Sequence, residues 1–145
     1  MIGLLALVLL VLSPACSKGK PPADIFAAAL NGDLNRVQTL VAENPDLVNA
    51  QNQSGLTPLH LAAIKGQVAI AEFLLQKGAD PNLAEANGDT PLHFAASYGY
   101  VEIVRSLLEH GAKVNLRNLD GKTALSRGRP GPAIAELLKR HGGVE

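Results

Sequence analysis

A nine-residue segment of this chain recurs at a fixed spacing. Residues 55–63 (GLTPLHLAA) return 33 positions later as residues 88–96 (GDTPLHFAA), and a weaker third copy begins at Gly121. A period of this length is typical of stacked repeat arrays, in which each unit buries its apolar side against its neighbours. The spacing therefore predicts an elongated array rather than a fold closed around one core. We expect its function to reside on a surface, not in a catalytic pocket.

Composition narrows the class of protein. The 145 residues suffice for one domain, and a formal net charge of zero argues against non-specific binding to nucleic acid through charge alone. Aromatic residues make up only 3% of the chain, so Leu, Ala, Ile and Val must supply the core. Such a core favours small helices packed closely together. We expect no nucleic-acid partner.

The unit at residues 53–85 shows how one repeat is built. Thr57 is suited to cap a helix, and Pro58 fits its first position, where a missing N–H costs nothing. Gly66 ends this helix, because glycine permits the left-handed turn that follows. Apolar residues at helical spacing then predict a second helix over Val68–Lys77. Each unit is therefore predicted to be a turn followed by two antiparallel helices.

The neighbouring units follow the same plan with small changes. The unit at residues 86–118 places its second helix over Val101–His110. The unit at residues 23–52 predicts helices over Asp24–Gly32 and Leu34–Glu43, without the Thr-Pro-Leu-His lead. A terminal unit is expected to be atypical, since one of its sides faces water.

The last unit, residues 119–143, departs most from the plan. Its segment Ser126–Pro132 contains two glycines and two prolines, which cannot sustain a regular helix. We expect the first helix to be one turn long or absent, and the second to run over Ala133–Arg140. The unit is interpreted as a shortened cap. The alternative is an irregular basic loop with a binding role.

These motifs resemble the ankyrin repeat, whose signature is T-P-L-H-x-A-A with the ending G-A-x-x-N. Residues 57–63 and 90–96 match the signature, and residues 78–82 and 111–115 match the ending. The resemblance covers residues 23–143. It implies an all-α solenoid of about four stacked helix-turn-helix units joined by β-turn loops. It also implies a monomeric, non-catalytic module that binds another protein and needs no cofactor.

In the ankyrin family, partners usually meet the turn tips and the exposed side of the first helices, which line a concave face. Carried over to this sequence, the resemblance gives a set of candidate partner-binding residues: Leu56, Ile64, Lys65, Asn87, Asp89, Ser97, Tyr98, Tyr100, Arg117, Leu119, Asp120 and Lys122. Ile64, Tyr98 and Tyr100 stand out, because large apolar or aromatic groups near water often anchor contacts. The alternative is that Tyr98 and Tyr100 pack on adjacent loops. Basic residues on this face favour an acidic partner, with scattered solvated charge as the alternative: Lys65, Arg117, Lys122, Arg127 and Arg129.

The first fifteen residues carry a different signal. Ile2 to Leu12 is an unbroken apolar run, too short to span a bilayer and typical of a secretory signal peptide. Ala15 followed by Cys16 resembles the cleavage site of a bacterial lipoprotein precursor, in which the cysteine carries lipid. Ser13 departs from that pattern, because Leu is usual there. The start also lacks the expected positive charge.

The resemblance predicts a signal peptide at residues 1–15, a lipidated Cys16 and a tether at residues 16–22. Ser17 resembles the residue usual in outer-membrane lipoproteins, so we expect the protein in the periplasm, anchored to the outer membrane through Cys16 alone. Ordinary secretion with a free thiol and an uncleaved anchor are the alternatives.

Few residues could carry chemistry. His60 and His93 lie one repeat apart and could in principle share a metal ion, but the ankyrin resemblance implies that they stabilise the turns. No nucleophile or phosphate-binding motif is present, so we expect no enzyme. Three rival functions remain. They are an envelope inhibitor or immunity-type protein that neutralises a partner enzyme, a metal-binding envelope enzyme using these two histidines, and a structural spacer.

Overall fold

The computed structural model describes residues 23–145, so the predicted signal peptide, Cys16 and the tether lie outside the described residues. Within the described part, the chain forms helices and turns and contains no strand, as the sequence predicts. None of the helices in this range combines the length and apolar character needed to cross a membrane.

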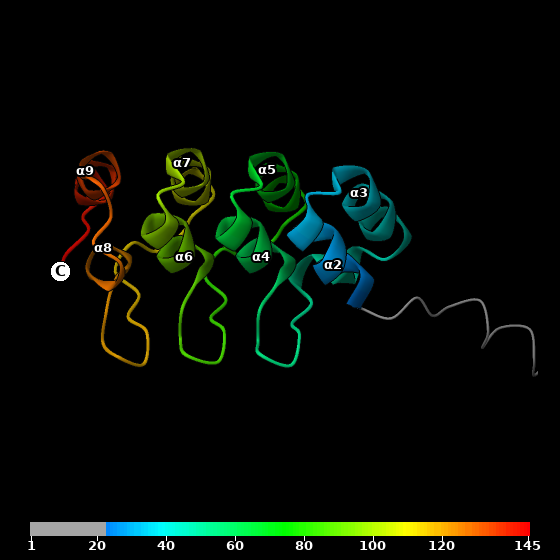
Figure 1. The fold of residues 1–145 in the computed structure, drawn as a ribbon, viewed down its shortest axis with the longest axis horizontal. Helices are drawn as coiled ribbons and strands as arrows, with labels where there is room; N and C mark the ends of the chain where they lie inside the picture. The colour runs from blue at the N-terminus through cyan, green and yellow to red at the C-terminus, as the bar shows by residue number, and fades with distance from the viewer. Residues whose placement is uncertain (1–22) are drawn as a thin grey trace, which may run out of the picture.

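The helices come in consecutive pairs. The first helices of the pairs are α2 (Ala23–Asn31), α4 (Pro58–Lys65), α6 (Pro91–Tyr98) and α8 (Ala124–Arg127). The second helices are α3 (Leu34–Glu43), α5 (Val68–Gln76), α7 (Val101–Glu109) and α9 (Pro132–Arg140), and a short 3₁₀ helix, η1 (Pro45–Asn49), follows α3. Figure 1 shows the first helices in one row, the second helices in a parallel row, and the turn tips projecting beyond the first row. The predicted helical solenoid is confirmed.

Helix α4 begins and ends where local signals place it. The Thr57 side chain accepts a hydrogen bond from the N–H of His60, and His60 Nδ1 accepts one from the N–H of Thr57. This reciprocal pair satisfies two backbone donors that the first turn of a helix leaves free. Pro58 occupies the first position, and Gly66 ends the helix with a φ of 69°, which a residue with a Cβ rarely adopts.

The core runs along the array between the two rows of helices. Leu59, Leu74, Leu92 and Leu107 are essentially fully buried, and each contributes one apolar side chain to this continuous layer. Helix α4 packs against α2 and α6, while α5 packs against α3 and α7. Burial of each such side chain contributes about 1.5–3 kcal/mol relative to exposure, so each unit depends on its neighbours for stability.

A row of asparagines joins successive units at the ends of the second helices. Asn82 Oδ1 accepts a hydrogen bond from the N–H of Lys113 at 2.8 Å, and Asn82 Nδ2 donates to the carbonyl of Gly111 at 3.1 Å. Asn49 and Asn115 make the same two kinds of bond to the units that follow them. These are the asparagines of the G-A-x-x-N endings and of the equivalent position in the first unit. Each loop is therefore held against the next.

The last unit is shortened, as expected. Helix α8 is a single turn, and the chain then bends through Gly128 and Arg129 before α9. Arg129 has a φ of 48°, in the left-handed region that glycine favours. Helix α9 begins at Pro132 rather than at the predicted Ala133, because proline is well accommodated at the first helical position.

Candidate partner-binding face

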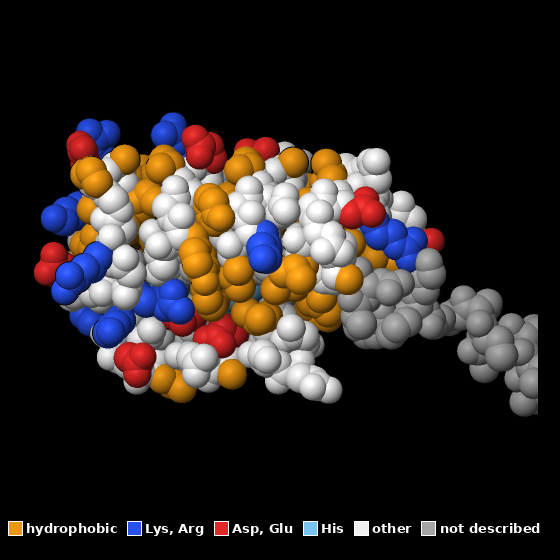
Figure 2. All heavy atoms as spheres, in the orientation of Figure 1, with side chains coloured by type: hydrophobic (Ala, Val, Ile, Leu, Met, Phe, Trp, Pro, Cys, Tyr) orange, Lys and Arg blue, Asp and Glu red, His pale blue; other side chains and the backbone are white. Residues whose placement is uncertain are grey.

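The exposed sides of α2, α4, α6 and α8, together with the turn tips, form what we call the first-helix face. The 33-residue period places equivalent side chains in rows across it. One row contains Leu61, which is buried, followed by the half-buried Phe94 and Arg127, and the next contains the half-buried Ile64 and Ser97. Figure 2 shows hydrophobic side chains gathered in a band over α2, α4 and α6, between the turn tips and the second-helix row. This band is the most extensive apolar surface in the view.

Tyr98 is the last residue of α6 and Tyr100 is the N-cap of α7, and the two side chains differ in environment. The Tyr98 side chain is 56% exposed, which is high for an aromatic residue. The ring of Tyr100 is half-buried and covers Gly66, where an added Cβ would lie 2.5 Å from the ring. The two ring centroids are 6.4 Å apart. Tyr100 therefore packs on the turn of the preceding unit and supports Tyr98, which remains available for contact.

The candidate residues divide into three groups by exposure. The exposed group consists of Lys65, Asn87, Tyr98, Arg117, Leu119, Asp120 and Lys122, and the half-buried group of Leu56, Ile64, Ser97 and Tyr100. Leu119, at a turn tip, is 79% exposed. Asp89 is the exception, because it is only 3% exposed. The prediction that Asp89 is a surface contact residue is wrong.

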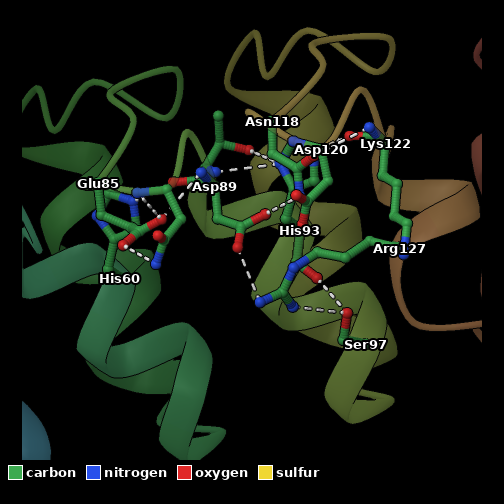
Figure 3. Close-up of polar contacts among 11 residues, drawn as sticks. His60, Glu85, Asp89, His93, Ser97, Asn118, Asp120, Lys122 and Arg127 are labelled. Atoms are coloured by element: carbon green, nitrogen blue, oxygen red, sulfur yellow. Dashed lines mark hydrogen bonds and ion pairs between the residues drawn. The ribbon is translucent and has the colours of Figure 1, made fainter.

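Asp89 is buried because its carboxylate is fully used within the protein. Oδ1 accepts a hydrogen bond from Asn118 Nδ2 at 2.9 Å, and Oδ2 lies 2.8 Å from Arg127 Nη2. Arg127 also donates to Ser97 Oγ at 3.0 Å, and its guanidinium lies 4.7 Å from the centroid of the Phe94 ring. Figure 3 shows Arg127 reaching from α8 back to Asp89 and Ser97. This network fastens the one-turn helix to the unit before it.

Sequence reasoning placed Arg127 only among the basic surface residues. A signal for its role was present, since the repeat period aligns Arg127 with Leu61 and Phe94 on the first-helix face. A charged residue at a position that is otherwise apolar calls for a partner, and the nearest carboxylate one unit earlier is Asp89.

His60 and His93 stabilise turns rather than binding a metal ion. Nδ1 of His60 accepts the N–H of Thr57 at 3.0 Å, so Nε2 must carry the ring proton, which it donates to the carbonyl of Asp89 at 3.0 Å. His93 makes the same contacts to Thr90 and to the carbonyl of Lys122. Burial lowers the pKa of both rings below the usual histidine value, and the carbonyl contacts oppose this only in part.

These contacts leave no ring nitrogen of either histidine free for a metal ion. Within residues 23–145 no group of three or more His, Cys, Asp or Glu side chains is placed to hold one. The rival hypothesis of a metal site shared by His60 and His93 therefore conflicts with the geometry. On each ring, Nδ1 accepts a hydrogen bond that caps its own helix, and Nε2 donates one to the carbonyl of the next unit, so a metal would have to displace one of these bonds on each histidine.

The turn tips are held by side chains that the sequence analysis missed. Asn52 Oδ1 accepts the N–H groups of Ser54 and Leu56, and the Glu85 carboxylate and Asn118 Oδ1 hold the next two tips in the same way. These three residues recur at the 33-residue spacing, which is the signal that could have revealed them. The tips are also joined to one another, since the N–H of Leu119 donates to the carbonyl of Asn87 at 2.9 Å.

Comparison with known proteins agrees with this geometry. The family model described as "Ankyrin repeats (3 copies)" matches residues 25–128, more than two thirds of the chain. The chain is 41% identical over 59 residues to human "Ankyrin repeat family A protein 2", a stretch that covers 41% of this chain and 18% of that protein. It is 39% identical over 69 residues to rat "Ankyrin repeat and SAM domain-containing protein 6", covering 48% of this chain and 8% of that protein.

A fission-yeast relative, "Palmitoyltransferase akr1" of Schizosaccharomyces pombe, is 43% identical over 58 residues, which cover 40% of this chain and 9% of that protein. The chain thus spans less than a fifth of the length of these relatives. Ankyrin repeats generally mediate protein–protein interaction and are generally not catalytic. With its matched family model, paired helices and Thr-His turn bonds, the chain belongs to the ankyrin-repeat family.

Proposed function

We propose that this protein is a non-catalytic interaction module of the bacterial cell envelope, and that it binds one partner protein through the first-helix face and the turn tips. The observation that carries the proposal is the 56% exposure of Tyr98, the last residue of α6, on a face where hydrophobic side chains form a band over α2, α4 and α6. Large aromatic side chains in such a surface are frequent binding anchors, and removal of one that acts as a hot spot costs about 2 kcal/mol or more.

The face is also organised before any partner arrives. Each turn tip is fixed by side-chain hydrogen bonds, and the tips are bonded to one another. Tyr100 lies against Gly66 and beside Tyr98, which limits the freedom of the exposed ring. Association costs about 0.5–1.5 kcal/mol for each side chain that must be immobilised, so a face ordered in advance binds with a smaller penalty.

Attachment to the membrane is a separate part of the proposal. It is supported by the apolar run from Ile2 to Leu12 and by the Ala15–Cys16 pair. A cysteine carrying two or more acyl chains stays on a bilayer, because each buried methylene contributes about 0.8 kcal/mol. Residues 17–22 would then reach at most ~20 Å, at about 3.5 Å per residue, and would hold the array close to the outer membrane.

The partner-binding part is tested by photo-crosslinking in the native envelope followed by capture. Wild-type protein is compared with the variants Tyr98→Ala and Lys65→Glu, and with Lys139→Glu, an exposed charge on α9 in the second-helix row. We expect one partner to be captured by the wild type and by Lys139→Glu, and to be lost with Tyr98→Ala. Equal recovery with all variants contradicts binding at the first-helix face.

The anchoring part is tested with labelled palmitate. We expect label in the wild type and none in Cys16→Ala. Equal label in both proteins contradicts acylation at Cys16, and it leaves the binding part of the proposal untouched.

A further inference from the structure

The first-helix face changes character along the array. The equivalent positions of α4, α6 and α8 carry Leu61, Phe94 and Arg127, so an apolar row ends in a guanidinium. Lys122 at the last turn tip and Arg129 after α8 are exposed beside it. Figure 2 shows Lys and Arg side chains gathered next to the α8 end of the hydrophobic band. The face therefore has an apolar end and a basic end.

The positive charges at the basic end are only partly neutralised by carboxylates of the protein. Among residues 23–145, the side chains of Lys122 and Arg129 make no hydrogen bond or ion pair. Arg127 neutralises Asp89, but its side chain is 26% exposed, and only two of its five N–H donors are used by Asp89 and Ser97. Asp120 is the exposed carboxylate on the same turn tip. Positive charge therefore remains in excess here.

Resting on the proposed function, we infer that the partner presents an extended segment with apolar side chains at one end and carboxylates at the other. The apolar side chains lie over Ile64, Phe94 and Tyr98, and the carboxylates lie over Arg127, Lys122 and Arg129. Charge complementarity sets this placement, because the opposite placement would put carboxylates on the apolar band and leave the basic end unpaired.

The repeat spacing sets the length of this segment. Helices in contact lie about 8–10 Å apart, so the path from α4 to α8 is roughly 20 Å. An extended chain advances ~3.3 Å per residue, so the first apolar contact and the carboxylates are separated by about six residues. Arg127 is well suited to receive a carboxylate, because Phe94, Ser97 and Asp89 already hold its guanidinium in place.

The test is selection of displayed random linear peptides of about twelve residues, long enough to cross the face, on the immobilised full chain. We expect enriched peptides to carry aromatic or aliphatic residues separated by about six positions from Asp or Glu, with the same order in all selected peptides. Binding of these peptides should weaken at least about tenfold in Kd with Lys122→Glu combined with Arg129→Glu, and should weaken as NaCl is raised, since salt screens exposed charges.

A matched control reverses two charges elsewhere. Arg105→Glu combined with Lys139→Glu alters exposed side chains of α7 and α9, and we expect it to leave the Kd within about twofold. Tyr98→Ser reports on the apolar end and should weaken every selected peptide.

The outcomes separate the two proposals. Peptides that depend on Tyr98 but show no acidic bias, or that bind the Lys122→Glu/Arg129→Glu variant normally, overturn this inference and leave the proposed function standing. Failure to select any peptide overturns this inference alone, because a folded partner protein could still bind the face. Binding of the selected peptides that is insensitive to Tyr98→Ser, together with equal capture of the envelope partner by wild type and Tyr98→Ala, overturns both.

Discussion

The Asp89 carboxylate and the Arg127 guanidinium lie 2.8 Å apart, although 38 positions separate them in the chain. Asp89 precedes α6, and Arg127 is the last residue of the one-turn helix α8. A four-residue helix has little stability of its own, since nucleation of a turn is unfavourable. The pair therefore supplies part of what keeps α8 in register with the unit before it.

Loss of Arg127 should be markedly destabilising. Arg127→Leu restores an apolar side chain that matches Leu61 and Phe94, but it leaves the buried Asp89 carboxylate without its cation. Removal of one partner of a fully buried pair costs about 3–5 kcal/mol, and the partial exposure of Arg127 reduces the expected loss to about 1–3 kcal/mol. Urea unfolding of the variant measures this difference.

The double variant Asp89→Asn/Arg127→Leu provides the control. It removes both charges, so we expect it to recover part of the stability lost by Arg127→Leu alone. Arg105→Ala, an exposed site on α7, should change the free energy of unfolding by less than about 0.5 kcal/mol. If the loss of stability in the double variant equals the sum of the losses in Asp89→Asn and Arg127→Leu, the two residues do not interact.

Stability should fall on mild acidification. Burial lowers the pKa of His60 and His93 in the folded protein, whereas both rings have the ordinary value of about 6.5 when the chain is unfolded. Below about pH 6.5 the unfolded chain binds protons that the folded chain does not, so unfolding becomes easier as the pH falls. Each histidine contributes up to about 1.4 kcal/mol per pH unit in this window.

Urea unfolding at pH 7.5 and pH 5.5 checks this expectation, since carboxylates titrate mainly below that range. His60→Asn should lower stability at pH 7.5, because it removes the bond to the Asp89 carbonyl, and should reduce the pH dependence. Equal stability of the wild type at both pH values would contradict a depressed pKa in either ring.

Two glycines at equivalent positions should respond differently to the same substitution. Gly66 and Gly99 both end a first helix with positive φ, 69° and 84°. A Cβ at Gly66 would lie 2.5 Å from the Tyr100 ring, whereas a Cβ at Gly99 would meet nothing within 4 Å. Both alanine variants lose about 1–2 kcal/mol from the left-handed backbone, and Gly66→Ala loses more because Tyr100 must move.

A variant without the Tyr100 ring tests whether that ring causes the additional loss of stability in Gly66→Ala. In a protein carrying Tyr100→Ala, the change Gly66→Ala should cost no more than Gly99→Ala does in the wild type, as measured by thermal or urea unfolding. An excess that persists without the tyrosine ring would mean that Tyr100 is not its cause.

Zinc should not stabilise this protein through its repeats. All four ring nitrogens of His60 and His93 hold hydrogen bonds, so a metal ion has no free lone pair there. We expect the Tm of a Cys16→Ala variant to be unchanged by equimolar Zn²⁺. A rise in Tm that disappears in His60→Asn would revive the metal-binding hypothesis.

Features set by local chemistry could be predicted from the sequence. Thr57, Pro58 and Gly66 act within one turn of helix, and their roles follow from residue type alone. The predicted second helices Val68–Lys77 and Val101–His110 each end one residue late, because Lys77 and His110 cap the helices instead of continuing them.

Features set by distant contacts could not be predicted in the same way. Asp89 follows an Asn-Gly turn, which by itself indicates an exposed residue, and its burial depends on Arg127 in another unit. Tyr98 and Tyr100 flank Gly99, and residue type alone does not tell which ring is packed; the contact of Tyr100 with Gly66 of the preceding unit identifies it as the packed one. The prediction for Cys16 concerns residues outside the described range and stays a prediction.

The bonds of His60, Asn82 and Asn49 each reach one unit along the array and no further. Stability is therefore passed from each unit to the next. Among the units within residues 23–145, the first and the last contact only one other described unit, so they should exchange their amide hydrogens first. A ligand lying across α4, α6 and α8 would bridge the two junctions between these units, so it would slow opening at the carboxyl-terminal unit without touching the amino-terminal one.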